Sequence, residues 1–199
     1  MSVRWIPGEM MMANAFFDEG MLVDAGVYPM AVAKFQDEIE TIVLTHCHFD
    51  HIAYVREIAH MCNAEVAIHE ADLQGLTDDT YSLAMHFGRR SPGIKPDKIL
   101  KDGDSLGKYT VYHTPGHTQG SICLYDRVNR TLISGDTVFT DGGFGRYDFP
   151  GGNRAILINS IERLSKLEIN GLYPGHGEPV HEGGSLQVQS ALCGIRSGF

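Results

Sequence analysis

Residues 45–51 read THCHFDH and bring three histidines and one aspartate together within six positions. The four side chains are His46, His48, Asp50 and His51. Imidazole and carboxylate groups are good ligands for divalent first-row metals, and the imidazoles suit zinc or iron. A polar surface loop would carry scattered histidines, whereas these are concentrated, so the stretch predicts a metal site.

The segments on either side predict how this cluster is positioned. Residues 40–45 form a short, apolar and β-branched run, which is typical of a buried strand. Residues 52–61 have the spacing of a helix. The cluster is therefore expected where a strand ends and a helix begins, the place where α/β proteins bind ligands. If the segment is extended, alternation directs Cys47 away from the histidines on either side.

Further elements follow from pattern and turn residues. A hairpin is expected over residues 12–24 and a short helix over 29–37. The remaining expected strands cover 65–68, 98–100, 104–106, 109–114, 121–125, 131–134 and 171–173, and the remaining helices cover 153–167 and 184–194. Residues 77–96 lack clear periodicity and predict either a surface connection or a substrate loop. In the second case the ligand contacts would come from Tyr81, Met85, His86, Phe87, Arg89 and Arg90.

Composition limits the classes of function. A chain of 199 residues suits one domain, residues 1–199, with a sizeable core. The formal net charge of −9 disfavours binding along a nucleic-acid backbone. Four dispersed cysteines, and no apolar leader or long apolar run, lead us to expect a reduced, cytoplasmic protein without a membrane segment. The expected partner is a small-molecule substrate, and the oligomeric state is left open.

Three further ligand-type side chains follow other predicted strands. His117, Asp136 and His176 lie in the turns TPGHTQG, SGDT and YPGHG, in which glycine permits a sharp bend. With the first cluster this makes seven donors, more than the four that one structural zinc takes. Two metal ions about 3.5–4 Å apart need a bridging carboxylate, for which Asp136 is the candidate. The absence of sulfur donors favours a catalytic site over a structural one. Asp24, at another strand end, is either a partner that orients a metal-bound histidine or a turn-forming residue.

These motifs, in this order and spacing, resemble the metallo-β-lactamase superfamily, and within it the branch of glyoxalase II and the persulfide dioxygenases. The resemblance extends from Asn14 to His176 and includes LVDAG at residues 22–26, SGDTVF at 134–139 and GRYDFPGG at 145–152. It implies an α+β fold, a four-layer αβ/βα sandwich with the metal site at one edge between two sheets. It also favours the orienting role for Asp24.

The resemblance further implies two divalent metal ions, zinc in the first place, with iron or manganese as alternatives. One ion would be held by His46, His48 and His117, the other by Asp50, His51 and His176, and Asp136 would bridge them. A metal ion lowers the pKa of bound water to about 7, which gives a hydroxide able to attack a carbonyl at neutral pH. Asp50 would orient this water and take a proton, and is the expected catalytic residue. A thioester is the expected substrate, since a thiol of pKa about 8.5 leaves without a dedicated acid.

The resemblance leaves the substrate open. Only residues 177–199 follow the last ligand, so we expect the glutathione-binding helical domain of glyoxalase II to be missing. Arg146 matches a thiol-binding position there, and Tyr147 beside it is a second candidate for substrate contact. A lactone hydrolase is one alternative. Another is a persulfide dioxygenase, in which a single iron would be held by His46, His117 and Asp136.

Overall fold

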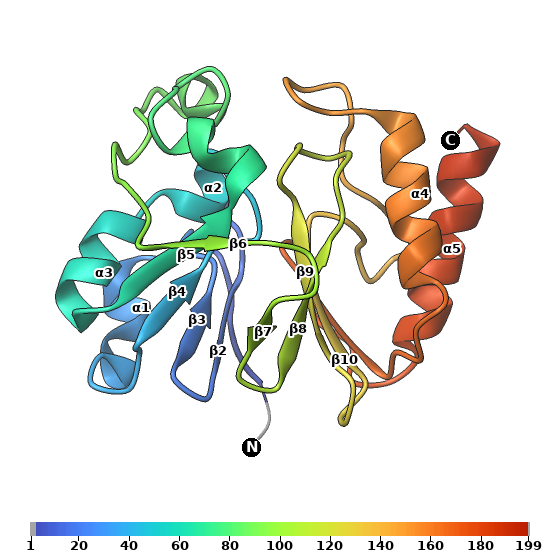
Figure 1. Cartoon of the computed structure of the whole chain (residues 1–199), viewed down its shortest axis with the longest axis horizontal. Helices are drawn as coiled ribbons and strands as arrows, with labels where there is room; N and C mark the ends of the chain where they lie inside the picture. The colour runs from blue at the N-terminus through green and yellow to red at the C-terminus, as the bar shows by residue number, and fades with distance from the viewer. Residues whose placement is uncertain (1–2, 199) are drawn as a thin grey trace. The chain divides into compact units, whose positions relative to one another are not determined.

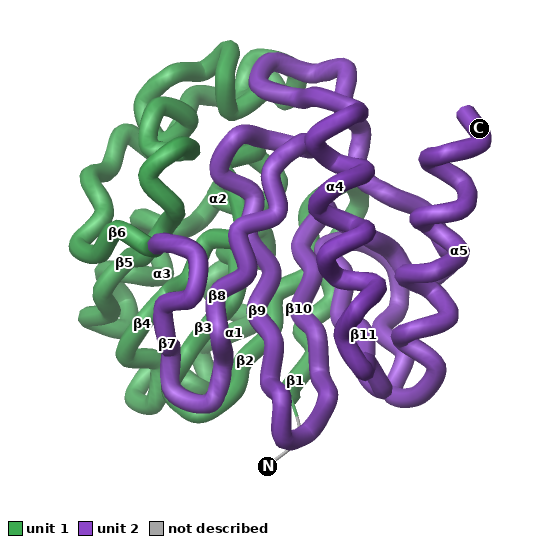
Figure 2. Tube along the Cα trace, turned by 45° about the vertical axis from the view of Figure 1, so that its right-hand side comes forward, with its two compact units in different colours: residues 1–100 green, residues 101–199 purple. Residues whose placement is uncertain are grey.

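The computed structural model describes residues 3–198, and the chain divides into two compact units, Met1–Leu100 and Lys101–Phe199. Figure 2 colours them as unit 1 and unit 2. Each unit has its own sheet, its own helices and its own apolar core. Among residues 3–198, no helix has both the length and the apolar character that crossing a membrane requires.

Unit 1 contains a six-stranded sheet in which the strands lie in chain order. They are β1 (Arg4–Ile6), β2 (Ala15–Asp18), β3 (Met21–Val23), β4 (Thr41–Val43), β5 (Glu65–His69) and β6 (Lys98–Leu100). The first three strands pair antiparallel, and β3 to β6 pair parallel. Because β3, β4 and β5 run the same way, their carboxyl ends meet at one edge, and the loops leaving that edge are neighbours.

The helices of unit 1 are short. They are α1 (Pro29–Val32), α2 (Phe49–Ile52) and α3 (Val55–Cys62), with 3₁₀ turns η1 (Ala33–Phe35), η2 (Glu70–Leu76) and η3 (Ala84–Phe87). Pro29 begins α1 at the position where its missing N–H costs nothing, and Asn63 ends α3 in the left-handed conformation. Figure 1 shows α1 and α3 on one side of the sheet. Apolar side chains from strands and helices, among them Leu22, Ile42 and Ile58, form the core between them.

Unit 2 contains a five-stranded sheet in the order β11-β10-β9-β8-β7. The strands are β7 (Ser105–Leu106), β8 (Tyr109–His113), β9 (Ile122–Asp126), β10 (Thr131–Gly135) and β11 (Gly171–Pro174). Neighbours pair antiparallel except β10 and β11, which are parallel. The parallel pair needs a crossover, and it contains α4 (Arg154–Leu164). Asn153 caps this helix by accepting a hydrogen bond from the Ile156 amide at 3.1 Å.

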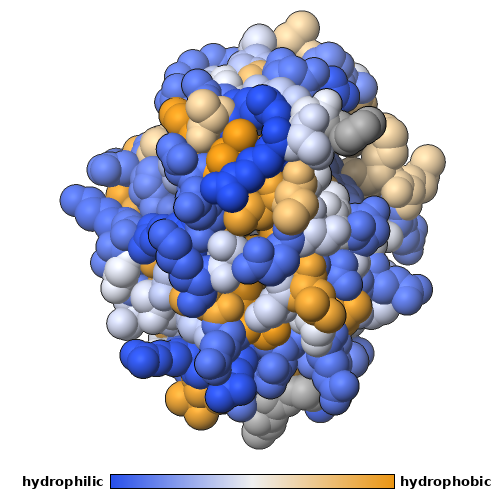
Figure 3. Space-filling model, turned by 90° about the vertical axis from the view of Figure 1, so that its right-hand side faces the viewer, coloured by the Kyte–Doolittle hydropathy of each residue, from blue (hydrophilic) through white to orange (hydrophobic). Residues whose placement is uncertain are grey.

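The two long helices of unit 2, α4 and α5 (Gly184–Ser197), lie side by side over its sheet (Figure 1). Leu157, Ile161 and Leu164 of α4 are buried in the core, whereas Ile156 is exposed. Figure 3 looks onto the side of the molecule that carries these helices, where hydrophilic side chains predominate and hydrophobic ones form small separate groups. The predicted amphipathic pattern of α4 therefore places its apolar stripe against the sheet.

Most predicted elements are present, with differences at three places. The expected helix over 29–37 is the four-residue α1 followed by η1, which ends at Phe35. The short strand β1 was not predicted, and it pairs with β2. The expected helix over 52–61 is wrong in its start: a separate turn, α2, precedes α3, and the two are interrupted at Ala53 and Tyr54. The interruption has a tertiary cause, because the Tyr54 amide donates to the Ala25 carbonyl at 3.0 Å, outside the helix.

Candidate metal centre

The THCHFDH stretch lies where β4 ends and α2 begins, as its sequence predicts. The Leu44 amide bonds the Ala67 carbonyl of β5 at 2.9 Å, and His48 precedes the first residue of α2. The carbonyls of the turn are held as well: Asp50 accepts from the Ala13 amide at 3.1 Å and His51 from the Ala25 amide at 2.7 Å. The backbone of the candidate ligands is therefore fixed from both sides by other segments of unit 1.

Asp24 is the side chain that orients this stretch. It follows β3 with a left-handed φ of 62° and is 1 % exposed. Its Oδ1 accepts the Thr45 amide at 2.7 Å, and its Oδ2 accepts the Thr45 hydroxyl at 2.8 Å and pairs with His51 Nδ1 at 2.7 Å. A carboxylate can only accept, so Nδ1 of His51 is the donor and Nε2 is the nitrogen directed at the metal position. Asp50 Oδ2 lies 3.7 Å from that Nε2.

The other two imidazoles of unit 1 lie beside His51. The ring centroids of His46 and His51 are 4.0 Å apart, and those of His46 and His48 are 4.8 Å apart. Because the Thr45 hydroxyl proton is given to Asp24, the 3.1 Å contact between Thr45 Oγ1 and His46 Nδ1 makes the imidazole the donor. His46 therefore also presents Nε2 as its coordinating nitrogen.

Asp72 is a positioning residue that the sequence did not suggest. Its carboxylate is fully buried in η2, and its Oδ2 accepts the backbone amide of Cys47 at 2.9 Å. Burial, and next the negative charge of Asp72, raise the pKa of the Cys47 thiol well above its usual value. The Cys47 side chain lies in the core of unit 1, which confirms that it points away from the ligands. Added at Gly75, a Cβ would approach Cys47 Sγ to 2.4 Å, so η2 packs directly on the ligand stretch.

In unit 2 the three predicted ligands come from three strand ends. His117 follows β8, Asp136 follows β10, and His176 follows β11. Asp136 Oδ2 lies 3.7 Å from His117 Nε2 and 3.7 Å from His176 Nε2. The sheet thus brings one carboxylate and two imidazoles together although they are separated widely in sequence.

His117 is oriented by main chain rather than by a carboxylate. Its Nδ1 donates to the Arg146 carbonyl at 2.6 Å, which leaves Nε2 to face Asp136. The turn before it needs glycine: Gly116 has a φ of 128°, and a Cβ there would lie 2.4 Å from the Leu157 amide nitrogen. The support of this ligand in unit 2 is thus a backbone group, whereas Asp24 supports His51 in unit 1 with a side chain.

The two predicted substrate-contact residues lie in the loop after Asp136. The Arg146 guanidinium is exposed, forms two hydrogen bonds to Asp148 at 2.9 and 2.7 Å, and lies 4.1 Å over the Phe149 ring. The hydrogen bond from Arg146 lowers the pKa of Asp148. Tyr147 is partly buried and stacks on Phe144, with centroids 6.5 Å apart. Tyr147 therefore packs on the core of unit 2, whereas Arg146 is bound to a neighbouring carboxylate.

Three histidines outside the motifs form local structural hydrogen bonds. His69 caps η2 by accepting the Ala71 amide at 3.2 Å, and His113 Nε2 bonds the Gln119 carbonyl at 2.9 Å. His181 Nδ1 bonds the Tyr173 hydroxyl at 3.1 Å.

The donor chemistry of both clusters fits a divalent metal. Each contains imidazole nitrogen and carboxylate oxygen, and in each an oriented imidazole presents Nε2 toward a carboxylate 3.7 Å away. Two groups at that spacing can contact the same cation, and hydrogen bonding of the opposite ring nitrogen is the usual arrangement of metal-binding histidines.

The model of the metallo-β-lactamase superfamily matches residues 15–176, a range that contains both clusters. The chain belongs to this superfamily. The probable metallo-hydrolase YqgX of Bacillus subtilis is 32% identical over 192 residues, 89% of this chain and 90% of that protein. The acyl-coenzyme A thioesterase MBLAC2 of Gallus gallus is 35% identical over 159 residues, 67% of this chain and 55% of that protein.

Solved structures agree with the superfamily match. The crystal structure of TTHA1623 in a di-iron-bound form superposes with a TM-score of 0.77 at 32% identity, covering 85% of this chain and 89% of that one. The predicted α+β fold of the metallo-β-lactamase type is confirmed by these comparisons. TTHA1623 was crystallised with two iron ions, so a related protein of this fold binds metal.

Proposed function

We propose that this member of the superfamily is a metal-dependent hydrolase with a two-metal centre that cleaves a thioester. The observation that carries the proposal is the orientation of His51 and His117. Each has Nδ1 bonded to an acceptor, at 2.7 and 2.6 Å, and each turns Nε2 toward a carboxylate. Metal-binding histidines almost always have this arrangement, and here it occurs twice.

The proposed centre combines the ligands of the two units. The superfamily match spans both sets, which supports one shared centre. One ion would be held by His46, His48 and His117, the other by Asp50, His51 and His176, and Asp136 would contact both. We propose zinc, with iron or manganese as alternatives. The alternatives remain because His and Asp ligands accept all three metals, and cellular supply decides much of the occupancy. The di-iron form of TTHA1623 supports iron as an alternative.

The proposed mechanism assigns separate roles to the residues. Bound metal ions supply Lewis acidity, which polarises a carbonyl and acidifies a water molecule. Asp50 is half-buried; its Oδ2, 3.7 Å from His51 Nε2, would contact a metal ion, which leaves Oδ1 to accept a proton from water. Asp24 holds the Nε2 of His51 in place, and the Arg146 carbonyl does the same for His117. These contacts fix the ligands before substrate arrives, so little reorganisation is needed during the reaction.

A thioester is the proposed substrate for chemical reasons. A thiol has a pKa of about 8.5 and departs as a thiolate, so no further acid is required in the site. The name of the MBLAC2 relative, an acyl-coenzyme A thioesterase, supports this class. Arg146 and Tyr147 are the proposed contacts of the thiol portion, because Arg146 matches the position of a basic, thiol-binding residue in glyoxalase II.

The test is metal analysis of the purified protein together with hydrolysis of S-lactoylglutathione and of octanoyl-coenzyme A. We expect about two metal ions per chain and turnover of at least one substrate. His48→Ala and His117→Ala should each lose metal, and kcat/KM should fall more than about 100-fold. Changing the hydrogen-bond partner of a metal-binding histidine typically costs about 10–100-fold, and removing the histidine itself should cost more. His60→Ala is the matched control, because this exposed histidine belongs to α3 and to no cluster.

Two outcomes would overturn the proposal. Full activity in either ligand variant would remove the catalytic assignment. Oxygen uptake with glutathione persulfide by a protein that contains one iron, and no thioester turnover, would instead support the dioxygenase alternative.

A further inference from the structure

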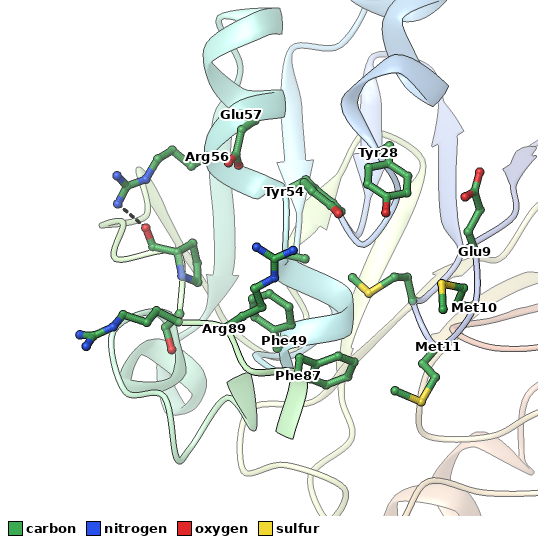
Figure 4. Close-up of a pocket in the computed structure, with 15 residues that line it drawn as sticks. Glu9, Met10, Met11, Tyr28, Phe49, Tyr54, Arg56, Glu57, Phe87 and Arg89 are labelled. Atoms are coloured by element: carbon green, nitrogen blue, oxygen red, sulfur yellow. Dashed lines mark hydrogen bonds between the residues drawn. The ribbon is translucent and has the colours of Figure 1, made fainter. Parts of the chain in front are cut away.

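A pocket of about 700 Å³ in unit 1 has no part in the metal-ligand set. This volume is within the range of about 300–1,000 Å³ that small-molecule sites occupy. Its lining comes from four segments: the turn before β2, Tyr28 just before α1, the α2–α3 region, and the loop over residues 77–96. Figure 4 shows methionines at one side of it, aromatic rings below and tyrosines above.

The pocket touches the metal-binding stretch through Phe49. This side chain lies between His48 and Asp50 in sequence, and it lines the pocket together with Ala53. Phe49 and Ala53 are four positions apart, so they share one face of the helical turn, whereas His51 is on the opposite face. The pocket is therefore adjacent to the ligand turn and separate from the ligand atoms. Such a place suits the far end of a long substrate rather than its reacting carbonyl.

The walls combine apolar surface with hydroxyl donors. Phe49 and Phe87 form a ring pair with centroids 5.2 Å apart, and Tyr28 and Tyr54 form another at 4.9 Å. Burial, and next the hydrogen bond with Tyr28, raise the pKa of Tyr54 to about 12, so it is a neutral hydroxyl at pH 7. Met11 is 67% exposed at the opposite wall, and together with Met10 it presents apolar surface to the pocket.

Arginines give the loop side of the pocket a positive charge. Arg89 and Arg90 line it, and Figure 4 shows the Arg89 guanidinium directed inward, between Phe49 and Tyr54. Arg56 has a different role, because its guanidinium donates to the carbonyls of Pro92 and Gly93, the latter at 2.9 Å, and ties the loop to α3. Two carboxylates, Glu9 and Glu57, also line the pocket, with Glu9 beside the methionines. In a chain of net charge −9, the Arg89 guanidinium beside the aromatic rings, with Arg90 also lining the pocket, is positive charge that a bound anion could contact.

The loop that carries these arginines is well anchored. The Phe49 amide donates to the Ser82 carbonyl at 2.7 Å, and the Ser91 amide donates to Asp79 Oδ1 at 2.7 Å. The Ser82 and Ser91 hydroxyls are 2.8 Å apart. The loop is thus tied to α2 through Ser82 and Phe87, and its segments on either side of η3 are tied to each other through Asp79, Ser82 and Ser91.

We propose that this pocket binds the phosphate-bearing carrier of an acyl thioester, with Arg89 and Arg90 contacting phosphate and the aromatic and methionine walls contacting the rest of the carrier. The proposal rests on the proposed thioester hydrolase. It makes the carrier a coenzyme A-type thiol, which has both phosphates and a planar base, rather than glutathione, which has carboxylates for the arginines but no ring for the aromatic walls. Guanidinium groups bind phosphate in a two-pronged geometry, and aromatic faces accept a planar ring.

The experiment measures binding by calorimetry on the metal-loaded protein, with coenzyme A and pantetheine as probes. Pantetheine shares the thiol arm and has no phosphate. We expect coenzyme A to bind at least about tenfold more tightly at low salt, and this advantage to shrink in about 0.5 M NaCl. The double variant Arg89→Gln/Arg90→Gln should bind the two probes equally, while Met11→Ser should weaken both. Arg127→Gln and Met30→Ser, exposed residues outside the pocket, are the matched controls.

Binding requires no turnover, so the two proposals can fail separately. Coenzyme A binding without any thioester hydrolysis would overturn the proposed hydrolase function but would support the proposed carrier-binding pocket. Hydrolysis with equal affinity for both probes, or an unchanged preference in the double variant, would overturn the pocket assignment.

Discussion

The two units hold their candidate ligands in different ways. Unit 1 concentrates four of them in one turn after β4, and the carboxylate of Asp24 orients that turn through Thr45 and His51. Unit 2 distributes three ligands over three strand ends and orients His117 with the main-chain carbonyl of Arg146. A ligand held by a side chain can be loosened by one substitution. A ligand held by a backbone carbonyl depends on the course of the whole loop.

Both units require glycine beside the ligands, so replacing these glycines is expected to have the largest effect on stability and metal binding. A Cβ at Gly26 would lie 1.9 Å from the Asp50 carbonyl oxygen, and one at Gly145 would lie 2.0 Å from the Asp136 carbonyl oxygen. Neither backbone can move without shifting a ligand. We expect Gly26→Ala and Gly145→Ala each to cost at least about 3 kcal/mol of unfolding free energy, measured by urea denaturation, and to lose metal.

The control for this comparison is Gly194 in α5. A Cβ there would meet Phe144 Cε1 at 3.5 Å, an ordinary contact, and alanine favours a helix. Gly194→Ala should therefore be neutral or stabilise by up to about 1 kcal/mol. If Gly26→Ala behaved like this control, the close approach of the two loops in unit 1 would not be needed for folding.

The ligands of the two units also differ in how readily the sequence predicts them. The dense THCHFDH stretch predicts a metal site by itself. His117, Asp136 and His176 become candidate ligands only through their glycine-containing turns and their order in the chain. The strands and the longer helices were predicted because turn residues and periodicity are local signals. β1 was not predicted, and the break between α2 and α3 depends on a hydrogen bond from Tyr54 to the distant Ala25.

The supports of the site were predictable only in part. Asp24 was suggested by its strand end and by the resemblance. Asp72 was not, because it acts 25 residues away from Cys47 through a backbone amide, and nothing near it in sequence marks that contact. The Arg146 carbonyl gave no signal either, since a main-chain acceptor is present at every residue. The ligands are residue types, which a sequence displays, while their supports are contacts, which only folding creates.

The difference between the two supports predicts an intermediate effect for Asp24→Asn. The amide cannot replace both acceptor oxygens, so one of the contacts to Thr45 or His51 is lost or reversed. We expect metal affinity to fall about 10–100-fold, as is typical when the partner of a metal-binding histidine is changed. Competition with a fluorescent zinc chelator measures this. Asp18→Asn, another buried aspartate of unit 1 outside the cluster, is the control. Equal affinity in Asp24→Asn and the wild type would contradict the orienting role.

The smallest expected effect belongs to Arg146→Gln in unit 2. Its carbonyl, which holds His117, is unchanged by the substitution, and its exposed guanidinium hydrogen-bonds the exposed Asp148. We therefore expect the melting temperature and the zinc affinity to match the wild type. If Arg146 also contacts substrate, as proposed, KM rises while the metal content stays full; Asp148→Asn, which frees the guanidinium, should then lower KM or leave it unchanged. Loss of metal in Arg146→Gln would mean that the loop depends on the side chain. The contrast between main-chain support in unit 2 and side-chain support in unit 1 would then fail.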